Sequence, residues 1–92
     1  MRFLSYSIIY VPSWDVYFSK MDNSVQQMIL KKIEKQKEET PARHMKFGVE
    51  FYVIEVGQYR VAIKILEKEK IKEIHFAGSH KQYEKWYKKL AK

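Results

Sequence analysis

The sequence contains no cysteine, only three glycines and two prolines, and no long hydrophobic run. The absence of cysteine excludes a disulfide scaffold, a thiolate zinc site and a cysteine nucleophile. Because no glycine-, serine- or proline-rich stretch could serve as a linker, the 92 residues predict a single domain over residues 1–92. No apolar run approaches the roughly 20 residues that a membrane-spanning helix needs, and the N-terminus does not read as a signal peptide. We therefore expect a soluble cytoplasmic domain without a membrane partner.

Negative charge is also scarce. The 11 acidic residues stand against 18 lysines and arginines, which gives a formal net charge of +7. The excess is uneven, because basic and acidic residues balance within residues 1–30 and all of it lies in residues 31–92. Such a one-sided excess favours a polyanionic partner, either a nucleic acid or an acidic protein.

Hydrophobic patterning and turn residues predict the element order β-α-α-β-β-β-α. The expected strands cover residues 2–11, 51–56, 59–66 and 71–77, and the expected helices cover residues 13–21, 24–39 and 80–91. The connections between the last three strands are short, so these strands must form an antiparallel meander. The sequence thus predicts an α+β fold with the helices packed on one face of a mostly antiparallel sheet.

Side chains alternate between the two faces of a strand, so the last three strands can be sorted by face. The face that meets the helices is expected to hold the more apolar sets: Tyr52, Ile54, Val56, Tyr59, Val61, Ile63, Ile65, Ile74 and Phe76. The free face is expected to display Phe51, Val53, Glu55, Arg60, Ala62, Lys64, Glu73, His75 and Ala77. One interpretation of this face is a set of cross-strand ion pairs such as Arg60–Glu55. The other is a ligand site at Arg60, because the small Ala62 leaves room beside it.

The histidines do not indicate a metal site. His44, His75 and His80 are scattered along the sequence, without an H-E-x-x-H pattern or paired carboxylates at ligand spacing. The sequence also has no glycine-rich phosphate loop and no G-x-S-x-G motif. We therefore expect neither a metal ion nor a cofactor.

One loop before the sheet concentrates cationic side chains. Arg43, His44 and Lys46 lie close together just before a predicted strand. They could grip a phosphodiester backbone, or they could belong to an ordinary polar connector.

The C-terminal segment, residues 79–90, interleaves aromatic rings with lysines. Rings that stack on bases and ammonium groups that contact phosphates suit unstacked RNA. Packing against the sheet explains Trp86 and Leu90, since a small domain needs its large side chains inside. Functional roles are expected for His80, Lys81 and Tyr87, whereas Tyr83 could either pack in the core or stack on a base.

Several motifs follow one another along nearly the whole chain. Residues 56–61 read Val-Gly-Gln-Tyr-Arg-Val, and residues 76–83 read Phe-Ala-Gly-Ser-His-Lys-Gln-Tyr. Two shorter signals are Ser-Trp-Asp at residues 13–15 and Lys-Phe-Gly at residues 46–48. Together they resemble the RelE/ParE superfamily of bacterial and archaeal toxins. The first motif is similar to the G-x-Y-R strand of that superfamily, and the second to the G-T-H-K-x-Y ending of its HigB branch.

The resemblance implies a microbial RNase-type α+β fold and a cytoplasmic toxin of a type II toxin–antitoxin system, neutralised by a cognate antitoxin protein. It also implies metal-independent mRNA cleavage on the ribosome, which inhibits translation. Arg60 would then lie against the scissile phosphate, with His80, Lys81 and Tyr87 near the reaction. Contacts to RNA would come from a further set: Arg43, His44, Lys46, Lys64, Tyr83 and Lys85.

Metal-free RNA cleavage needs a base for the 2′-hydroxyl, cations for the developing phosphorane charge and an acid for the leaving 5′-oxygen. Arg60 can clamp phosphate oxygens in a bidentate manner. His80 can serve as base or acid, because imidazole changes its protonation near neutral pH. Lys81 adds positive charge and Tyr87 can stack on a base. The products would be a 2′,3′-cyclic phosphate and a 5′-hydroxyl.

One departure from the family pattern leaves the activity open. RelE carries two lysines on the strand that matches residues 51–56, and this sequence has Val53 and Glu55 at those positions. An endoribonuclease toxin is the first hypothesis. The second is a ParE-like or degenerate toxin that inhibits a protein target such as DNA gyrase without cutting RNA. The third is a basic RNA-binding domain with no toxin role.

Overall fold

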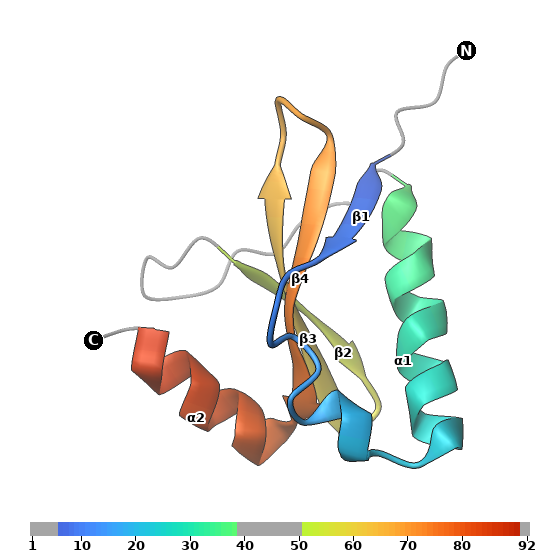
Figure 1. Cartoon of the computed structure of the whole chain (residues 1–92), viewed down its shortest axis with the longest axis vertical. Coiled ribbons are helices and arrows are strands. Elements are labelled where there is room, and N and C mark those ends of the chain that lie inside the picture. The colour runs from blue at the N-terminus through green and yellow to red at the C-terminus, as the bar shows by residue number, and fades with distance from the viewer. Residues whose placement is uncertain (1–5, 39–50, 91–92) are drawn as a thin grey trace.

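The computed structural model describes residues 6–38 and 51–90, which form a small sheet flanked by helices (Figure 1). The elements in chain order are β1 (Ser7–Tyr10), the 3-10 helix η1 (Phe18–Lys20), α1 (Asn23–Glu34), the 3-10 helix η2 (Lys35–Lys37), β2 (Tyr52–Val56), β3 (Tyr59–Leu66), β4 (Ile71–Ser79) and α2 (His80–Leu90). The predicted α+β class is confirmed.

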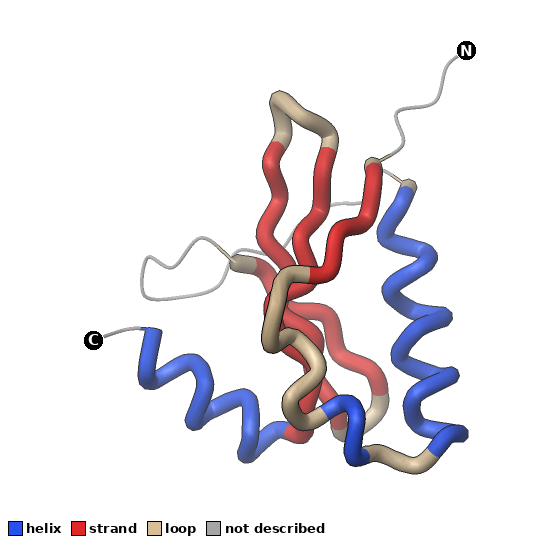
Figure 2. Tube along the Cα trace, viewed as in Figure 1, coloured by secondary structure: helices blue, strands red, loops and turns tan. Residues whose placement is uncertain are grey.

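The sheet has the strand order β1-β4-β3-β2. β2, β3 and β4 form the expected antiparallel meander, and β1 pairs with β4 in parallel (Figure 2). Parallel neighbours need a long crossover connection, and here the chain passes through α1, β2 and β3 between the two strands. β3 and β4 therefore hold the centre of the sheet, and β1 and β2 form its edges.

The short helix predicted over residues 13–21 is wrong. Only Phe18–Lys20 is helical, as a 3-10 helix, and the residues before it form turns. Ser13 has a φ of 74°, in the left-handed region that an α-helix does not use. Aromatic packing stabilises the turns, because the rings of Trp14 and Phe18 lie 4.5 Å apart between centroids and both contact the core.

The other predicted elements are present with changes at their ends. The regular part of α1 ends at Glu34, earlier than predicted, and the chain continues as η2. β1 begins at Ser7, and residues 2–5 of the longer predicted strand lie outside the described residues. β4 runs on to Ser79, so α2 follows without a loop. None of the helices in the described part of the chain is long and apolar enough to span a bilayer.

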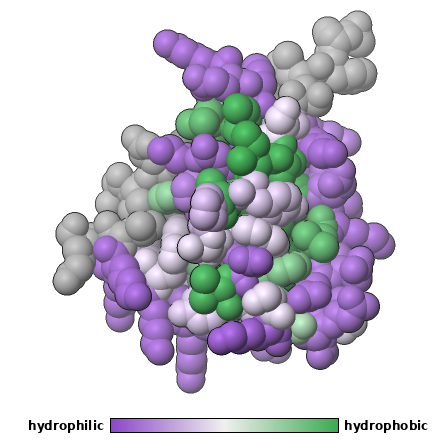
Figure 3. All heavy atoms as spheres, viewed as in Figure 1, coloured by the Kyte–Doolittle hydropathy of each residue, from purple (hydrophilic) through white to green (hydrophobic). Residues whose placement is uncertain are grey.

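α1 covers one face of the sheet and closes the hydrophobic core there. Ile29 and Ile33 lie one turn apart on the same side of α1, and both are completely buried. They pack with fully buried side chains of the central strands, Val61, Ile63 and Ile74. Burying each such side chain stabilises the fold by about 1.5–3 kcal/mol. Hydrophilic side chains make up most of the rim of the molecule, as Figure 3 shows for one face.

A bulge in β4 corrects part of the predicted face assignment. Ala62 of β3 pairs with Phe76, and the next residue of β3 pairs with Ile74, so His75 is the extra residue. The alternation of side chains changes at this point. Ala77 therefore joins the core beneath α1, whereas Phe76 faces the opposite side of the sheet. The prediction grouped Phe76 with Ile74 because strict alternation assumes a strand without a bulge.

α2 packs on the side of the sheet opposite α1 (Figure 1), so the prediction that the helices share one face is wrong. Trp86 stacks on Phe76 with 5.1 Å between ring centroids and meets Phe51 edge-on at 5.4 Å. These contacts confirm the predicted packing role of Trp86. They also mean that α2 covers part of the face that carries Arg60.

A buried lysine lies where the β3–β4 hairpin turns. Lys72 is completely buried, and its Nζ donates to the carbonyl oxygen of Glu38 at 3.2 Å. The same Nζ lies 4.3 Å from the centre of the Tyr6 ring. The Tyr52 hydroxyl donates to Gln36 Oε1 at 3.0 Å nearby. We call Tyr6, Gln36, Tyr52 and Lys72 the Lys72 cluster.

Candidate functional site

Arg60 lies at the start of β3, on the face that α2 partly covers. The β2–β3 hairpin places it opposite Glu55, and its Nη1 donates to Glu55 Oε2 at 2.9 Å. This contact confirms the predicted cross-strand ion pair. On its other side Arg60 lies opposite Gly78 of β4. A Cβ at Gly78 would come within 2.6 Å of the Phe76 ring and 2.9 Å of the Gln82 side chain, so only glycine fits here.

The first turn of α2 brings His80 to Arg60. Ser79 and Gln82 form a capping box, in which Ser79 N–H donates to Gln82 Oε1 at 2.8 Å and Gln82 N–H donates to Ser79 Oγ at 3.2 Å. This box fixes where α2 begins and hence where His80 stands. Nη2 of Arg60 lies 2.9 Å from His80 Nδ1. The structure therefore joins two predicted catalytic residues from different elements.

Glu84 extends this contact by one more group. Its Oε2 lies 3.0 Å from His80 Nε2, at i, i+4 along α2. The side chains of His80 and Glu84 are each about half exposed, and that of Arg60 is 25% exposed. A continuous row of contacts thus runs from β2 across β3 to α2. We call Glu55, Arg60, His80 and Glu84 the Arg60 cluster.

Two predicted tyrosines stand on the same helix as His80. The rings of Tyr83 and Tyr87 stack with 5.9 Å between centroids. Burial raises the pKa of Tyr83, Tyr87 adds to this rise, and the positive charge of Arg60 opposes it. Tyr83 and Tyr87 follow His80 by three and seven residues in α2, so the tyrosine stack lies within two helical turns of the Arg60 cluster. Lys81 is exposed and follows His80 directly.

Of the remaining predicted RNA contacts, Lys64 is not brought to this cluster. Lys64 lies further along β3, where it pairs in register with Glu73 of β4. Three further predicted RNA contacts lie outside the described part of the chain: Arg43, His44 and Lys46. Within residues 6–38 and 51–90, no three His, Asp or Glu side chains come together as a metal site.

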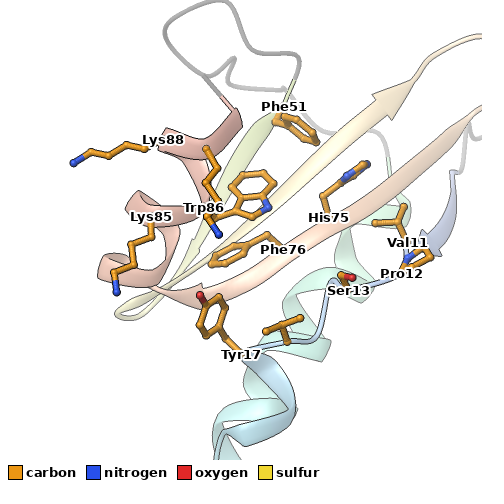
Figure 4. Close-up of a pocket in the computed structure, with 12 residues that line it drawn as sticks. Val11, Pro12, Ser13, Tyr17, Phe51, His75, Phe76, Lys85, Trp86 and Lys88 are labelled. Atoms are coloured by element: carbon orange, nitrogen blue, oxygen red, sulfur yellow. The ribbon is translucent and has the colours of Figure 1, made fainter. Parts of the chain in front are cut away.

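A groove of about 560 Å³ opens between α2 and the turns that follow β1. Aromatic rings line it: Figure 4 shows Phe51, Phe76 and Trp86 turned toward one another, with Tyr17 at one end. Its basic members all come from α2: Lys85, Lys88 and Lys89. His75, the bulge residue, also lines the groove and contacts Phe51 edge-on at 4.7 Å. We call this site the aromatic groove.

Sequence patterns do not identify the aromatic groove. Of its lining, only Lys85 is a predicted site residue. The sequence does carry a signal, because rings recur along the C-terminal half. Assigning Phe51, Phe76 and Trp86 to one surface requires the bulge at His75, which periodicity alone does not reveal.

Comparison with known proteins bears on the fold. No protein-family model matches the chain, and no curated protein sequence matches it significantly. A double mutant of the Escherichia coli toxin RelE in the free state superposes with a TM-score of 0.72 at 15% sequence identity, over 90% of this chain and 92% of that chain. The isolated E. coli RelE toxin in another crystal form matches with a TM-score of 0.67 at 14% identity, over 94% of this chain and 99% of that chain.

A complex gives a similar result. The toxin–antitoxin complex RelBE2 of Mycobacterium tuberculosis contains a chain that matches with a TM-score of 0.67 at 12% identity. The match covers 86% of this chain and 95% of that chain. The chain therefore has the RelE-like toxin fold, as its motifs predict.

Proposed function

We propose that this protein is the toxin of a type II toxin–antitoxin system, and that it cleaves mRNA on the ribosome, in the cytoplasm, without a metal ion. The observation that carries the proposal is the 2.9 Å contact between Arg60 Nη2 and His80 Nδ1. It joins a phosphate-binding group to an acid–base group on a fold shared with RelE toxins. Both side chains are exposed enough to meet a substrate.

The proposed reaction is an internal transfer at one phosphate. His80 takes the proton of the 2′-hydroxyl, and the 2′-oxygen forms a bond to phosphorus. The bond from phosphorus to the 5′-oxygen breaks, and that oxygen leaves with the electron pair and takes a proton from water. Arg60 and Lys81 stabilise the charge on the phosphorane oxygens. The products are a 2′,3′-cyclic phosphate and a 5′-hydroxyl.

The aromatic groove and the tyrosine stack supply binding energy for RNA in this proposal. Base–aromatic stacking contributes about 1–3 kcal/mol per base, and it tolerates different bases. Lys85, with Lys88 and Lys89, would contact phosphates beside the groove. Tyr83 and Tyr87 would stack on bases next to Arg60. Phosphate contacts from Arg43, His44, Lys46 and Lys64 remain predictions from the sequence.

An antitoxin protein is the second proposed partner. One of the matching structures is a toxin–antitoxin complex, which supports a protein partner for this fold. The net charge of +7 favours an acidic antitoxin, because complementary charge accelerates association and disfavours wrong partners. Neutralisation requires this partner to cover the Arg60 cluster or to displace α2 from it.

A second function is supported by the ion pair of Arg60. Glu55 holds Nη1 of Arg60 at 2.9 Å, and Val53 stands on the same strand where RelE has a lysine. With Arg60 paired to Glu55 and no lysine at position 53, the cluster offers less positive charge to a phosphate. This suits a toxin that binds a protein target such as DNA gyrase and cuts no RNA. The RNase proposal requires that a substrate phosphate displaces Glu55 from Arg60.

Purified protein added to translating ribosomes tests the proposal. Primer extension on the mRNA should reveal cuts within the ribosome-bound codons, and the new ends should carry a 2′,3′-cyclic phosphate. Naked mRNA in the same buffer is the control for ribosome dependence. Intact mRNA under both conditions, together with inhibition of DNA gyrase, would replace the RNase proposal by the gyrase alternative.

A further inference from the structure

The Arg60 cluster fixes the position of one proton. A guanidinium can only donate hydrogen bonds, so His80 Nδ1, at 2.9 Å from Arg60 Nη2, must accept. The ring proton of neutral His80 therefore stands on Nε2, from which it donates to Glu84 Oε2 at 3.0 Å. A doubly protonated ring would oppose two donors at Nδ1 and break the contact with Arg60.

We propose that Glu84 is a positioning residue, which holds the Nε2 proton so that Nδ1 is the nitrogen that acts as base. The proposal rests on the RNase function above. Serine proteases use the same logic, in which a carboxylate on one ring nitrogen sets the tautomer and stabilises the imidazolium that forms. Here the carboxylate comes from the same helix, one turn away, so the capping box of α2 positions both groups.

Arg60 then occupies the lone pair of His80 Nδ1 until a substrate phosphate draws the guanidinium away. In the free protein its two terminal nitrogens are engaged by Glu55 and His80. A phosphate offers two oxygens in the geometry that matches the guanidinium fork. When Arg60 turns to the phosphate, the lone pair of Nδ1 is released beside the 2′-hydroxyl. The base is therefore exposed only when a phosphate is bound.

The surroundings of His80 are consistent with this order of events. In the described part of the chain the charged groups that contact it are Arg60 from β3 and Glu84 from α2, and Glu55 of β2 lies beyond Arg60. Because Arg60 contacts Nδ1 and Glu84 contacts Nε2, moving Arg60 to a phosphate frees Nδ1 and leaves the contact with Glu84 intact.

Glu84→Gln, compared with Glu69→Gln, tests the positioning role. Both substitutions remove one negative charge, and Glu69 lies in the exposed turn between β3 and β4. Glu84 is about half exposed, so its pair with His80 contributes little to folding and the variant should fold. We expect kcat of Glu84→Gln to fall roughly 10- to 100-fold with little change in KM, the range found for carboxylates that orient metal-binding histidines. Glu69→Gln should keep the wild-type kcat.

A spectroscopic readout separates this role from the activity itself. Imidazole ¹⁵N resonances of His80 should show a proton on Nε2 in the free form of all three proteins, because Arg60 occupies Nδ1. Once an oligonucleotide that lacks 2′-hydroxyls has drawn Arg60 away, the proton should stay on Nε2 in the wild type and in Glu69→Gln, whereas Glu84→Gln should show a mixture of tautomers. Adding an oligonucleotide that lacks 2′-hydroxyls should shift the wild-type Nδ1 resonance as Arg60 leaves it. An Nδ1 resonance that stays unchanged at saturation would overturn the covering role of Arg60.

The two proposals fail in different ways. If the wild type cuts RNA and Glu84→Gln matches Glu69→Gln in both kcat and tautomer, the positioning role is overturned while the RNase function stands. If the wild type cuts no RNA, the RNase function fails. The tautomer spectra then decide whether Glu84 holds the ring proton.

Discussion

Two cationic side chains at opposite ends of the β3–β4 pair differ in almost every respect. Lys72 is completely buried on the α1 side of the sheet, against the Tyr6 ring and the Glu38 carbonyl oxygen. Arg60 lies on the α2 side, is 25% exposed, and contacts the exposed Glu55 and His80.

The difference in burial indicates a structural role for Lys72 and a functional role for Arg60. A buried cation whose contacts are lost leaves a large desolvation cost, so the Lys72 cluster holds one arrangement. An exposed ion pair contributes little to stability, so its partners can be exchanged for a substrate. We therefore expect substitutions in the Lys72 cluster to change folding and substitutions in the Arg60 cluster to change activity.

Lys72→Ala is expected to have the largest effect on stability. The change removes the hydrogen bond to Glu38, the contact with the Tyr6 ring and the packing of a buried side chain. Large-to-small changes at buried sites cost about 2–5 kcal/mol, which lowers the melting temperature of so small a domain by roughly 10 °C or more. Lys68→Ala in the exposed turn is the control for thermal denaturation. Equal melting temperatures for the two variants would show that the buried lysine does not stabilise the fold.

The second-largest effect on stability is expected at alkaline pH, where Tyr52 of the Lys72 cluster ionises. Burial is the main cause that raises the pKa of Tyr52 to about 12, and the nearby Tyr6 and Glu67 add to it. The folded state keeps this proton to a higher pH than the unfolded state, whose phenol has a pKa near 10. The stability that results is therefore complete below about pH 10 and is lost as the pH rises through about 12.

Tyr52→Phe isolates this effect. The variant has no phenol to ionise at this position, so its denaturation midpoint should fall less between about pH 9 and pH 12 than that of the wild type. At neutral pH it should be less stable by about 1 kcal/mol, because Gln36 Oε1 loses its hydrogen bond from Tyr52. Parallel midpoint curves for the two proteins over this pH range would contradict the assignment.

The smallest effect is expected for Glu55→Gln in the Arg60 cluster, and it should appear as a change in RNA affinity. Glu55 competes with a phosphate for Arg60, and exposed ion pairs of this kind are worth about 0.2–1 kcal/mol, so RNA should bind roughly 1.4- to fivefold more tightly. The Glu69→Gln variant corrects for the general loss of one negative charge. Weaker RNA binding by Glu55→Gln than by this control would mean that Glu55 holds Arg60 in place for the substrate.

Local patterns predicted more of the fold than of the site. The meander and the start of α2 follow from alternation and turn residues, which act within a few residues, and the capping box seen in the structure agrees with that start. Ser13 and His75 escaped prediction, because a positive φ and a bulge are stabilised by packing against distant rings. The error at His75 reversed Phe76 and Ala77, which hid the aromatic groove.

The sequence predicted those site residues for which a family motif and the alternation of side chains along a strand could be used. Arg60 and His80 were identified from strand alternation and family motifs, and the 2.9 Å contact between them required the structure. Glu84 carries no sequence signal of its own, because a glutamate four residues after a histidine is common on exposed helices. Its role depends on the donor at the other ring nitrogen, which comes from a different strand.

The cleavage rate of Arg60 variants, measured with the melting temperature of each, tests the central claim most directly. Removing one electrostatic donor to a transition state typically costs two to three orders of magnitude in rate, and we expect about this loss for Arg60→Ala. Its melting temperature should stay within a few degrees of the wild type, because the change costs under about 0.5 kcal/mol. Arg60→Lys should recover little activity, since an ammonium cannot reproduce two parallel hydrogen bonds. Normal cleavage by Arg60→Ala, or its unfolding, would contradict the account and leave Arg60 as a structural partner of Glu55.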